Sequence, residues 1–107
     1  MYIYNITSNI DESIHDQLLT WIKNHIPQVL ATGAFKKATL IRVLVEEEMG
    51  GKTYSVQYKA RSREALDVFF KEHDQKLKQE VFKAFGDKVL SFCTELQIVD
   101  EYSVTFK

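Results

Sequence analysis

Strand-like and helix-like hydrophobic patterns alternate along this chain in an order that few folds can accommodate. Four segments (2–7, 35–47, 53–60 and 89–99) repeat apolar residues at every second position, which is typical of strands. Two longer segments show the 3.6-residue period of an amphipathic helix, one after the first strand and one after the third. This β-α-β-β-α-β order predicts a ferredoxin-like α+β fold, with a four-stranded antiparallel sheet and both helices on one face. A single domain is expected to span residues 1–107.

The first helix is predicted to begin after Asn9, whose side chain can cap it. Its apolar stripe consists of Ile14, Leu18, Trp21, Ile22, His25 and Val29. Pro27 disfavours a helical conformation at the residue before it, so the helix is predicted to kink or restart there and to end at Gly33. That break would place His25 in the last turn of a helical segment, where the helix dipole favours a protonated ring.

The second helix is predicted over residues 63–85, with Ser62 as its cap and Gly86 at its end. At 1.5 Å per residue it would be roughly 35 Å long, which is long for so small a domain. A break near His73, with Asp74 as a new cap, is therefore the alternative to one continuous helix.

A glycine pair marks the connection between the second and third strands. Residues 46–52 are predicted to form a hairpin turn in which Gly50 and Gly51 supply positive φ angles. The acidic residues before the pair are expected to be solvated, with a metal or partner contact as the alternative.

The alternation within the strands divides their side chains between the two faces of the sheet. The face toward the helices is predicted to hold Tyr2, Tyr4, Ile6, Tyr54, Val56, Tyr58, Leu90, Phe92, Leu96 and Ile98. The opposite face is predicted to hold Ile3, Asn5, Thr7, Ser55, Gln57, Ser91, Cys93 and Gln97, together with Ile41, Val43 and Val45. Because this opposite face is too apolar along one strand for open solvent, we expect the sheet of a second copy to cover it, which makes a homodimer.

The C-terminal residues 100–107 alternate again and predict a short extra strand. With no partner strand left in its own chain, this segment is expected to pair with an edge of its own sheet or of a neighbour's sheet.

Composition and charge exclude several kinds of partner. A net charge of −1 leaves no basic surface for nucleic acid or an anionic membrane, and no stretch approaches the roughly 20 apolar residues that cross a bilayer. The first residues lack the pattern of a signal peptide, and the single Cys93 cannot form an intramolecular disulfide, so a cytoplasmic location is expected. The three histidines lack metal-ligand spacing, so neither a metal nor a cofactor is expected.

Residues 1 to about 99 resemble a family of small bacterial proteins known only as a domain of unknown function. The blocks that carry this resemblance are 2–7, 21–35, 53–58 and 85–88. More distantly, the pattern of His25, Pro27 and Gly33 is similar to that of the EthD-like and antibiotic-biosynthesis-monooxygenase-like dimeric α/β barrels. The second resemblance implies two ferredoxin-like subunits that close their sheets into a shared barrel. It also implies a pocket in each subunit, between the sheet and the helices.

The aromatic side chains and histidines of the helix-facing side are the candidates for binding a ligand. His25 and His73 are predicted to lie on the inner faces of the two helices, opposite the tyrosine-rich face of the sheet. Rings can stack on a flat apolar molecule, while phenols and imidazoles orient it. The candidate ligand-binding residues are therefore Tyr4, Trp21, His25, Tyr54, Tyr58 and His73. The alternative is that they are core residues, because aromatic rings fill cores and buried imidazoles usually hydrogen-bond within them.

Three functions remain open from the sequence. The first is a dimeric domain that binds a small apolar or aromatic ligand without catalysis. The second is a cofactor-independent monooxygenase-like or isomerase-like enzyme in which His25 acts as acid or base. The third is a purely structural or interaction domain. The first ranks ahead because catalysis needs a supported acid or base, and His25 has no evident supporting partner in the sequence.

Overall fold

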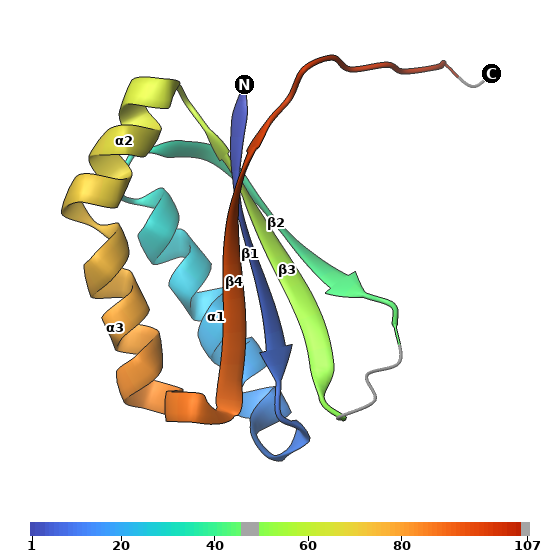
Figure 1. The fold of residues 1–107 in the computed structure, drawn as a ribbon, viewed down its shortest axis with the longest axis vertical. Coiled ribbons are helices and arrows are strands. Elements are labelled where there is room, and N and C mark those ends of the chain that lie inside the picture. Colours follow the sequence, from blue (N-terminus) through green and yellow to red (C-terminus); the bar gives the residue numbers. More distant parts are fainter. Residues whose placement is uncertain (46–49, 106–107) are drawn as a thin grey trace.

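The computed structural model of this chain describes residues 1–45 and 50–105 as one antiparallel sheet with helices packed on one of its faces (Figure 1). The strands are β1 (Tyr2–Ile10), β2 (Phe35–Val43), β3 (Lys52–Ala60) and β4 (Val89–Gln97). The helices are α1 (His15–Leu30), α2 (Arg63–Glu72) and α3 (Asp74–Phe85), and the short 3₁₀ turns η1 (Glu12–Ile14) and η2 (Gly86–Lys88) precede α1 and β4. The predicted β-α-β-β-α-β order is confirmed, with the second helix divided in two.

The strands lie in the order β2-β3-β1-β4, and every neighbouring pair is antiparallel. The two central strands pair with Tyr4 opposite Tyr58 and Ile6 opposite Val56, while β2 and β4 form the two edges. This is the predicted ferredoxin-like arrangement. Because both helical connections return across the same face, the other face of the sheet stays open (Figure 1).

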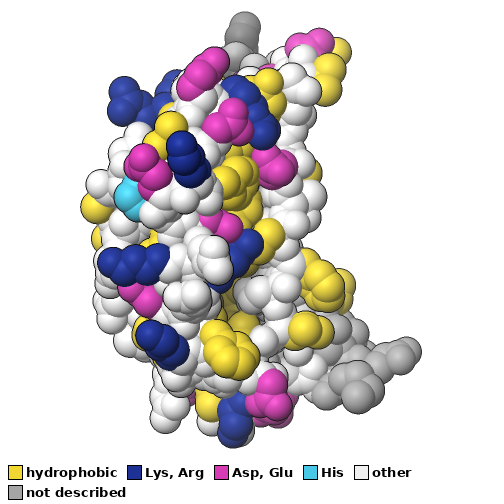
Figure 2. Space-filling view, turned by 60° about the vertical axis from the view of Figure 1, so that its left-hand side comes forward, with side chains coloured by type: hydrophobic (Ala, Val, Ile, Leu, Met, Phe, Trp, Pro, Cys, Tyr) yellow, Lys and Arg dark blue, Asp and Glu magenta, His cyan; other side chains and the backbone are white. Residues whose placement is uncertain are grey.

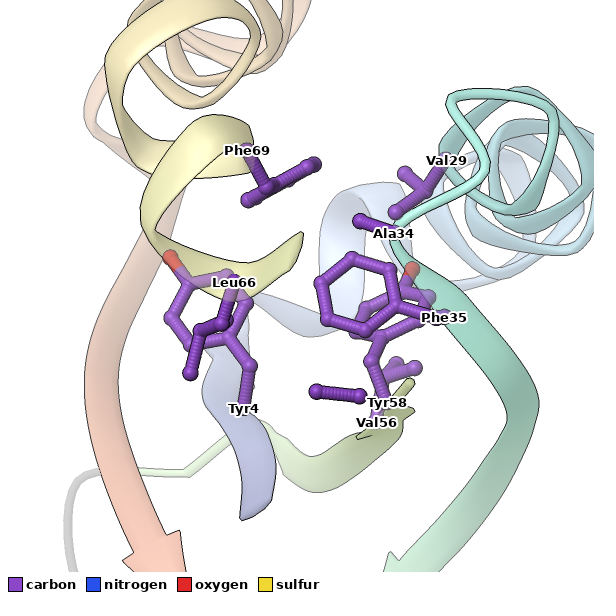
Figure 3. Packing of buried hydrophobic residues seen from close by; sticks show 9 residues of the cluster. Tyr4, Val29, Ala34, Phe35, Val56, Tyr58, Leu66 and Phe69 are labelled. Atoms are coloured by element: carbon purple, nitrogen blue, oxygen red, sulfur yellow. The ribbon is translucent and has the colours of Figure 1, made fainter. Parts of the chain in front are cut away.

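The core lies between the helices and the centre of the sheet, and it is built mainly from aromatic rings (Figure 3). The Tyr4 and Phe35 ring centroids are 6.5 Å apart, and those of Phe35 and Phe69 are 4.9 Å apart. Leu66 of α2 and Val29 of α1 pack beside these rings. Ring pairs at such distances add to the stabilisation that burial provides, so this cluster fixes α1 and α2 on the sheet.

Helix α1 continues through Pro27, so the predicted break is wrong. A proline removes the hydrogen bond that its N–H would donate to the carbonyl four residues earlier, here that of Lys23. Lys23 and Pro27 are both exposed, so water can bind the freed carbonyl oxygen. The helix ends with Ala31 as its C-cap, and Gly33 follows with φ of 83°. His25 is consequently inside the helix rather than in a last turn before the proline.

The first strand is longer than predicted, and the helix after it is capped by a different residue. β1 runs to Ile10, and Asn9 is a strand residue whose amide nitrogen lies 3.3 Å from the Thr53 hydroxyl oxygen. Asp11 caps η1 instead, because its carboxylate accepts a hydrogen bond of 2.8 Å from the Ser13 N–H. The cap assigned to Asn9 is therefore wrong by two residues.

The break predicted near His73 is confirmed. His73, with φ of −124° and ψ of −35°, separates α2 from α3. Asp74 is not the cap of α3, since no side chain caps that helix and the Asp74 carboxylate accepts a hydrogen bond from Tyr4 instead. Ser62 caps α2 as predicted.

The second strand ends at Val43, before the predicted limit, and residues 46–49 of the predicted strand and turn lie outside the described residues. The expected positive φ angles of Gly50 and Gly51 are confirmed, at 79° and 81°. A Cβ atom at Gly51 would lie 2.7 Å from the carbonyl oxygen of Ile10. Only glycine fits at this position, because both the backbone angle and the space exclude a side chain.

The two faces of β4 are the reverse of the prediction. Ser91 is paired with Ser8, and Cys93 with Ile6, so both lie on the helix-facing side. The side chains that turn to the open face are Leu90, Phe92 and Leu96. A period of two shows which residues share a face, but the register with β1 decides which way that face points. Cys93 is therefore on the helix side and not on the face predicted to meet a second sheet.

The C-terminal segment 98–105 forms no strand within the single chain, so the predicted pairing with an edge of its own sheet is absent from the described residues, and positions 106–107 of the predicted strand lie outside them. The Ile98 N–H donates a hydrogen bond of 2.8 Å to the Met1 carbonyl, and beyond this point the segment runs away from the helices (Figure 1). Its side chains Val99, Tyr102 and Val104 are exposed. The backbone N–H and C=O groups of such an extended segment can still pair with the edge strand of another sheet.

Candidate functional site

A cavity of about 560 Å³ lies between the sheet and the helices α1 and α3. Its wall is mostly apolar and includes Ile6, Leu18, Trp21, Ile22, Leu77 and Val81. Figure 2 shows hydrophobic side chains in the groove between the helical layer and the edge of the sheet. Phe82 of α3 lines the same cavity and is 70% exposed, so the cavity is open to solvent beside it. This volume and this lining are typical of sites for small molecules.

Four of the six candidate ligand-binding residues line this cavity, namely Tyr4, Trp21, His25 and Tyr58. Tyr54 and His73 do not. The Tyr54 ring packs with Ile10 and Leu18 in a second cluster, and His73 lies at the junction of α2 and α3 with its ring centroid 6.1 Å from that of Phe69.

The imidazole of His25 stacks on Trp21, with ring centroids 4.4 Å apart and planes inclined at 18°. Burial lowers the pKa of His25, while the negative charge of Glu80 acts in the opposite direction. The ring is therefore neutral near neutral pH, contrary to the expectation of a protonated ring, because His25 lies within α1 beside the cavity. Among the described residues its nitrogens have no hydrogen-bond partner. A neutral imidazole thus offers one donor and one acceptor to the cavity.

A polar corner of the cavity joins β1, α3 and β4. The Tyr4 hydroxyl donates a hydrogen bond of 2.9 Å to one oxygen of Asp74, and Lys78 Nζ lies 2.9 Å from the other oxygen. Burial raises the pKa of Tyr4, and the neighbouring Cys93 and Asp74 raise it further, so the phenol stays protonated. Sequence reasoning missed Asp74, Lys78 and Cys93 as cavity residues, and only the i,i+4 spacing of Asp74 and Lys78 offered a signal.

A pair of serines lies elsewhere along the same cavity wall. The hydroxyl oxygens of Ser8 and Ser91 are 2.8 Å apart across β1 and β4. Ser8 is buried and Ser91 is exposed, so both hydroxyls are satisfied when Ser8 donates to Ser91 and the Ser91 hydrogen turns to water or to a ligand.

Tyr58 is a cavity residue of a different kind, because its hydroxyl is unpartnered. The side chain is 2% exposed, yet among the described residues no group accepts a hydrogen bond from it. Burial alone raises the pKa of this phenol. No fully enclosed side-chain oxygen in the described residues lacks a partner. The Tyr58 oxygen is therefore not sealed in the core, and it reaches the space that Tyr58 lines.

The hydroxyl of Tyr54, by contrast, is held at the start of α1. His15 Nε2 lies 2.8 Å from it, and His15 Nδ1 lies 2.9 Å from a carboxylate oxygen of Asp16. Sequence reasoning missed this contact, because the α1 start had been assigned to an earlier residue. It explains why Tyr54 and Tyr58, on the same face of one strand, are in different environments.

In residues 1–45 and 50–105, no group of three or more histidine, cysteine, aspartate or glutamate side chains is arranged to hold a metal ion. The helices of these segments are also too short or too polar to cross a lipid bilayer.

A protein-family model described as "Domain of unknown function (DUF4286)" matches residues 1–99. Among curated proteins, none matches the sequence.

The fold is similar to that of several solved structures. A dimeric ferredoxin-like protein from an uncultured marine organism has a TM-score of 0.71 at 11% identity, over 94% of this chain and 97% of that one. HapK from Hahella chejuensis has a TM-score of 0.62 at 14% identity, over 98% and 100% of the two chains. A protein from Deinococcus radiodurans that is described as an antibiotic biosynthesis monooxygenase has a TM-score of 0.60 at 14% identity, over 99% of this chain and 100% of that one. These likenesses confirm the predicted ferredoxin-like fold.

Proposed function

The chain belongs to the DUF4286 family, whose function is unknown, and from that premise we propose that it binds a small apolar or aromatic molecule in the cavity between its sheet and its helices. The observation that carries the proposal is the cavity of about 560 Å³ beside a core of closely packed rings. Protein interiors have few voids larger than a water molecule. An apolar space of this size in a small domain is better explained by an occupant than by incomplete packing.

Two residue types that occur once in the chain allow the proposal to be tested without knowing the natural ligand. The chain has one tryptophan, Trp21, and one cysteine, Cys93, and both line the cavity. A ring compound in the cavity is expected to change the Trp21 emission and to slow the reaction of Cys93 with a thiol reagent. Emission and labelling rate are measured while 2-acetylnaphthalene is added, and both responses should saturate at the same concentration.

A matched pair of variants serves as the control for this titration. Val81→Phe adds volume inside the cavity and is expected to weaken binding by about tenfold, because overpacked space excludes the ligand. Val68→Phe makes the same change on an exposed position of α2 and should leave binding unchanged. If the compound binds both variants with equal affinity, it does not occupy the space beside Val81 and the proposal fails.

We also propose that the protein acts as a homodimer closed through the open face of the sheet. The described residues place apolar side chains of both edge strands on this face, namely Ile41, Val43, Leu90, Phe92 and Leu96, and Ile3 of the central strand β1 lies on it as well. Its centre holds short polar groups, where Ser55 bonds with Asn5 and Thr7 at 3.0 Å. Such a mixture suits packing against a second sheet better than contact with water. The C-terminal segment 98–105 is proposed as a second contact, since it runs away from the helices and its apolar side chains are exposed (Figure 1).

We further propose that residues 1–107 form a single cytoplasmic domain, since a lone cysteine agrees with a reducing compartment.

A second candidate function is acid–base catalysis by His25 in the same cavity. The observation in its favour is an imidazole that is neutral near pH 7 and has no hydrogen-bond partner among the described residues. A general base must be unprotonated and within reach of the proton that it takes. A catalytic imidazole also contributes little to the fold. His25→Ala should therefore leave the melting temperature nearly unchanged under this candidate, whereas a loss of about 2 kcal/mol or more would mark His25 as structural.

The lowered pKa of His25 predicts a specific pH dependence of stability. Below about pH 6.5 the unfolded chain binds a proton at this histidine before the folded chain does. The free energy of unfolding therefore falls as the pH is lowered from about 7 to about 5, and His25→Gln should make that fall shallower. Urea unfolding across this pH range measures the slope. Lys23→Gln, on the exposed side of the same helix, should keep the wild-type slope. An unchanged slope in His25→Gln would mean that the imidazole is fully hydrated in the folded protein.

A further inference from the structure

Two buried tyrosines line the cavity, Tyr4 and Tyr58. Among the described residues, the Tyr58 hydroxyl has no hydrogen-bond partner. Tyr58 lies on the helix-facing side of β3, and its ring centroid is 5.1 Å from that of Phe35. In Figure 3 the Tyr58 side chain rises from the sheet toward the helices, behind the Phe35 ring. Tyr4, directly opposite in the register of the sheet, donates its hydroxyl to Asp74.

The other polar groups of the cavity are partly or wholly occupied. Asp74 accepts from Tyr4 and from Lys78, and the Ser8 and Ser91 hydroxyls bond with each other. The Tyr58 side chain is 2% exposed and its hydroxyl has no acceptor among the described residues, so the acceptor must come from whatever fills the cavity, water or a ligand. The hydroxyl of Tyr58 is therefore positioned to receive an acceptor atom from whatever occupies the cavity.

The surroundings of this hydroxyl indicate the chemistry of that acceptor. The phenol stays protonated because burial raises its pKa, so its available interaction is to donate a hydrogen bond. Val29, Val56 and Phe69 line the same cavity and are apolar. The ammonium group of Lys78 already pairs with Asp74. With no unpaired positive charge next to the phenol among the described residues, an anionic ligand would lose hydration without compensation.

Resting on the proposed ligand-binding function, we propose that the cavity selects an uncharged aryl ketone. Its ring system occupies the space beside Trp21, and its carbonyl oxygen accepts a hydrogen bond from the Tyr58 hydroxyl. A carbonyl oxygen fits because it accepts without bringing a charge or a donor of its own, whereas an ammonium group can only donate and would place a second donor against the phenol. His25, whose ring nitrogens are unpartnered in the described residues, can accept from a hydroxyl on the same ligand.

The test uses two probes of the same shape. 2-Acetylnaphthalene and 2-isopropenylnaphthalene have the same heavy-atom framework and nearly the same volume, and they differ by the exchange of a carbonyl oxygen for a CH₂ group. Calorimetric titration of the full chain is expected to show that the ketone binds about tenfold more tightly than the hydrocarbon, as expected for one hydrogen bond to an otherwise unpaired buried donor. Equal affinities of the two probes would overturn the proposal.

A tyrosine pair on one strand provides the matched variants. Tyr58→Phe removes only the unpartnered hydroxyl and should abolish the preference for the ketone, so that the two probes bind within about twofold. Tyr54→Phe removes the hydroxyl that is held by His15 outside the cavity and should keep the wild-type preference. A preference that persists in Tyr58→Phe would also overturn the proposal.

The outcomes separate this inference from the proposed function. If both probes bind wild type equally and change the Trp21 emission, ligand binding stands and only the aryl ketone assignment fails. If neither probe binds nor protects Cys93, the proposed function fails and the inference fails with it. The comparison of the two probes on wild-type protein needs no variant, so it remains decisive even if Tyr58→Phe folds poorly.

Discussion

Replacing Phe69 with alanine is expected to lower the free energy of unfolding by about 3–5 kcal/mol. Phe69 is 2% exposed and contacts the rings of Tyr4, Phe35 and Phe70, so it joins α2 to both ends of the aromatic cluster. Alanine would leave a cavity at the place where the helical layer meets the sheet. Because small domains are stable by only about 5–15 kcal/mol, the loss is a large fraction of the total.

Chemical denaturation at one fixed protein concentration measures this effect, since dimerisation would make the apparent stability depend on concentration. Val68→Ala, one residue earlier on α2 and 49% exposed, is the control and should change the free energy of unfolding by less than about 0.5 kcal/mol. A loss below about 1 kcal/mol for Phe69→Ala would show that the cluster is much looser than its ring distances indicate.

Replacing Ile41 with glutamate is expected to convert the proposed dimer of twice 12.5 kDa into a monomer of 12.5 kDa. Ile41 lies on the open face of β2, opposite Ser55, and is 36% exposed in the single chain. In the single chain a carboxylate at this position reaches water. Between two sheets it would be buried without a partner, which typically costs several kcal/mol.

Light scattering at micromolar concentration distinguishes the two masses. Val68→Glu introduces the same charge on the exposed side of α2, away from the sheet, and should leave the dimer intact. A wild-type protein that scatters as a monomer would contradict the dimer outright. A dimeric Ile41→Glu variant would show that the copies meet through a different surface.

The candidate site was only partly predictable from the sequence. Tyr4, Trp21, His25 and Tyr58 could be placed toward the cavity because each lies on the inner face of a helix or strand with a regular period. Asp74, Lys78 and Cys93 could not, because Asp74 meets Tyr4 from 70 positions away in the chain and this contact exists only after α3 has packed on the sheet. The direction in which the pKa of His25 shifts could not be predicted from the sequence for a related reason. It depends on burial beside Trp21 rather than on the local position in the helix.

The sequence by itself determined the order of the elements and the ferredoxin-like fold, since apolar periodicity and capping residues are local properties of the chain. It left the break at His73 open as an alternative to one long helix, and it predicted the positive φ angles of Gly50 and Gly51. Only the tertiary structure decided which face of β4 points inward, because the alternation of Ser91 and Cys93 with Leu90 and Phe92 suits either orientation until β1 sets the register. It likewise decided that the Tyr54 hydroxyl finds His15 while the Tyr58 hydroxyl is left to the cavity. Such differences depend on distances between segments remote in the chain, which no local pattern specifies.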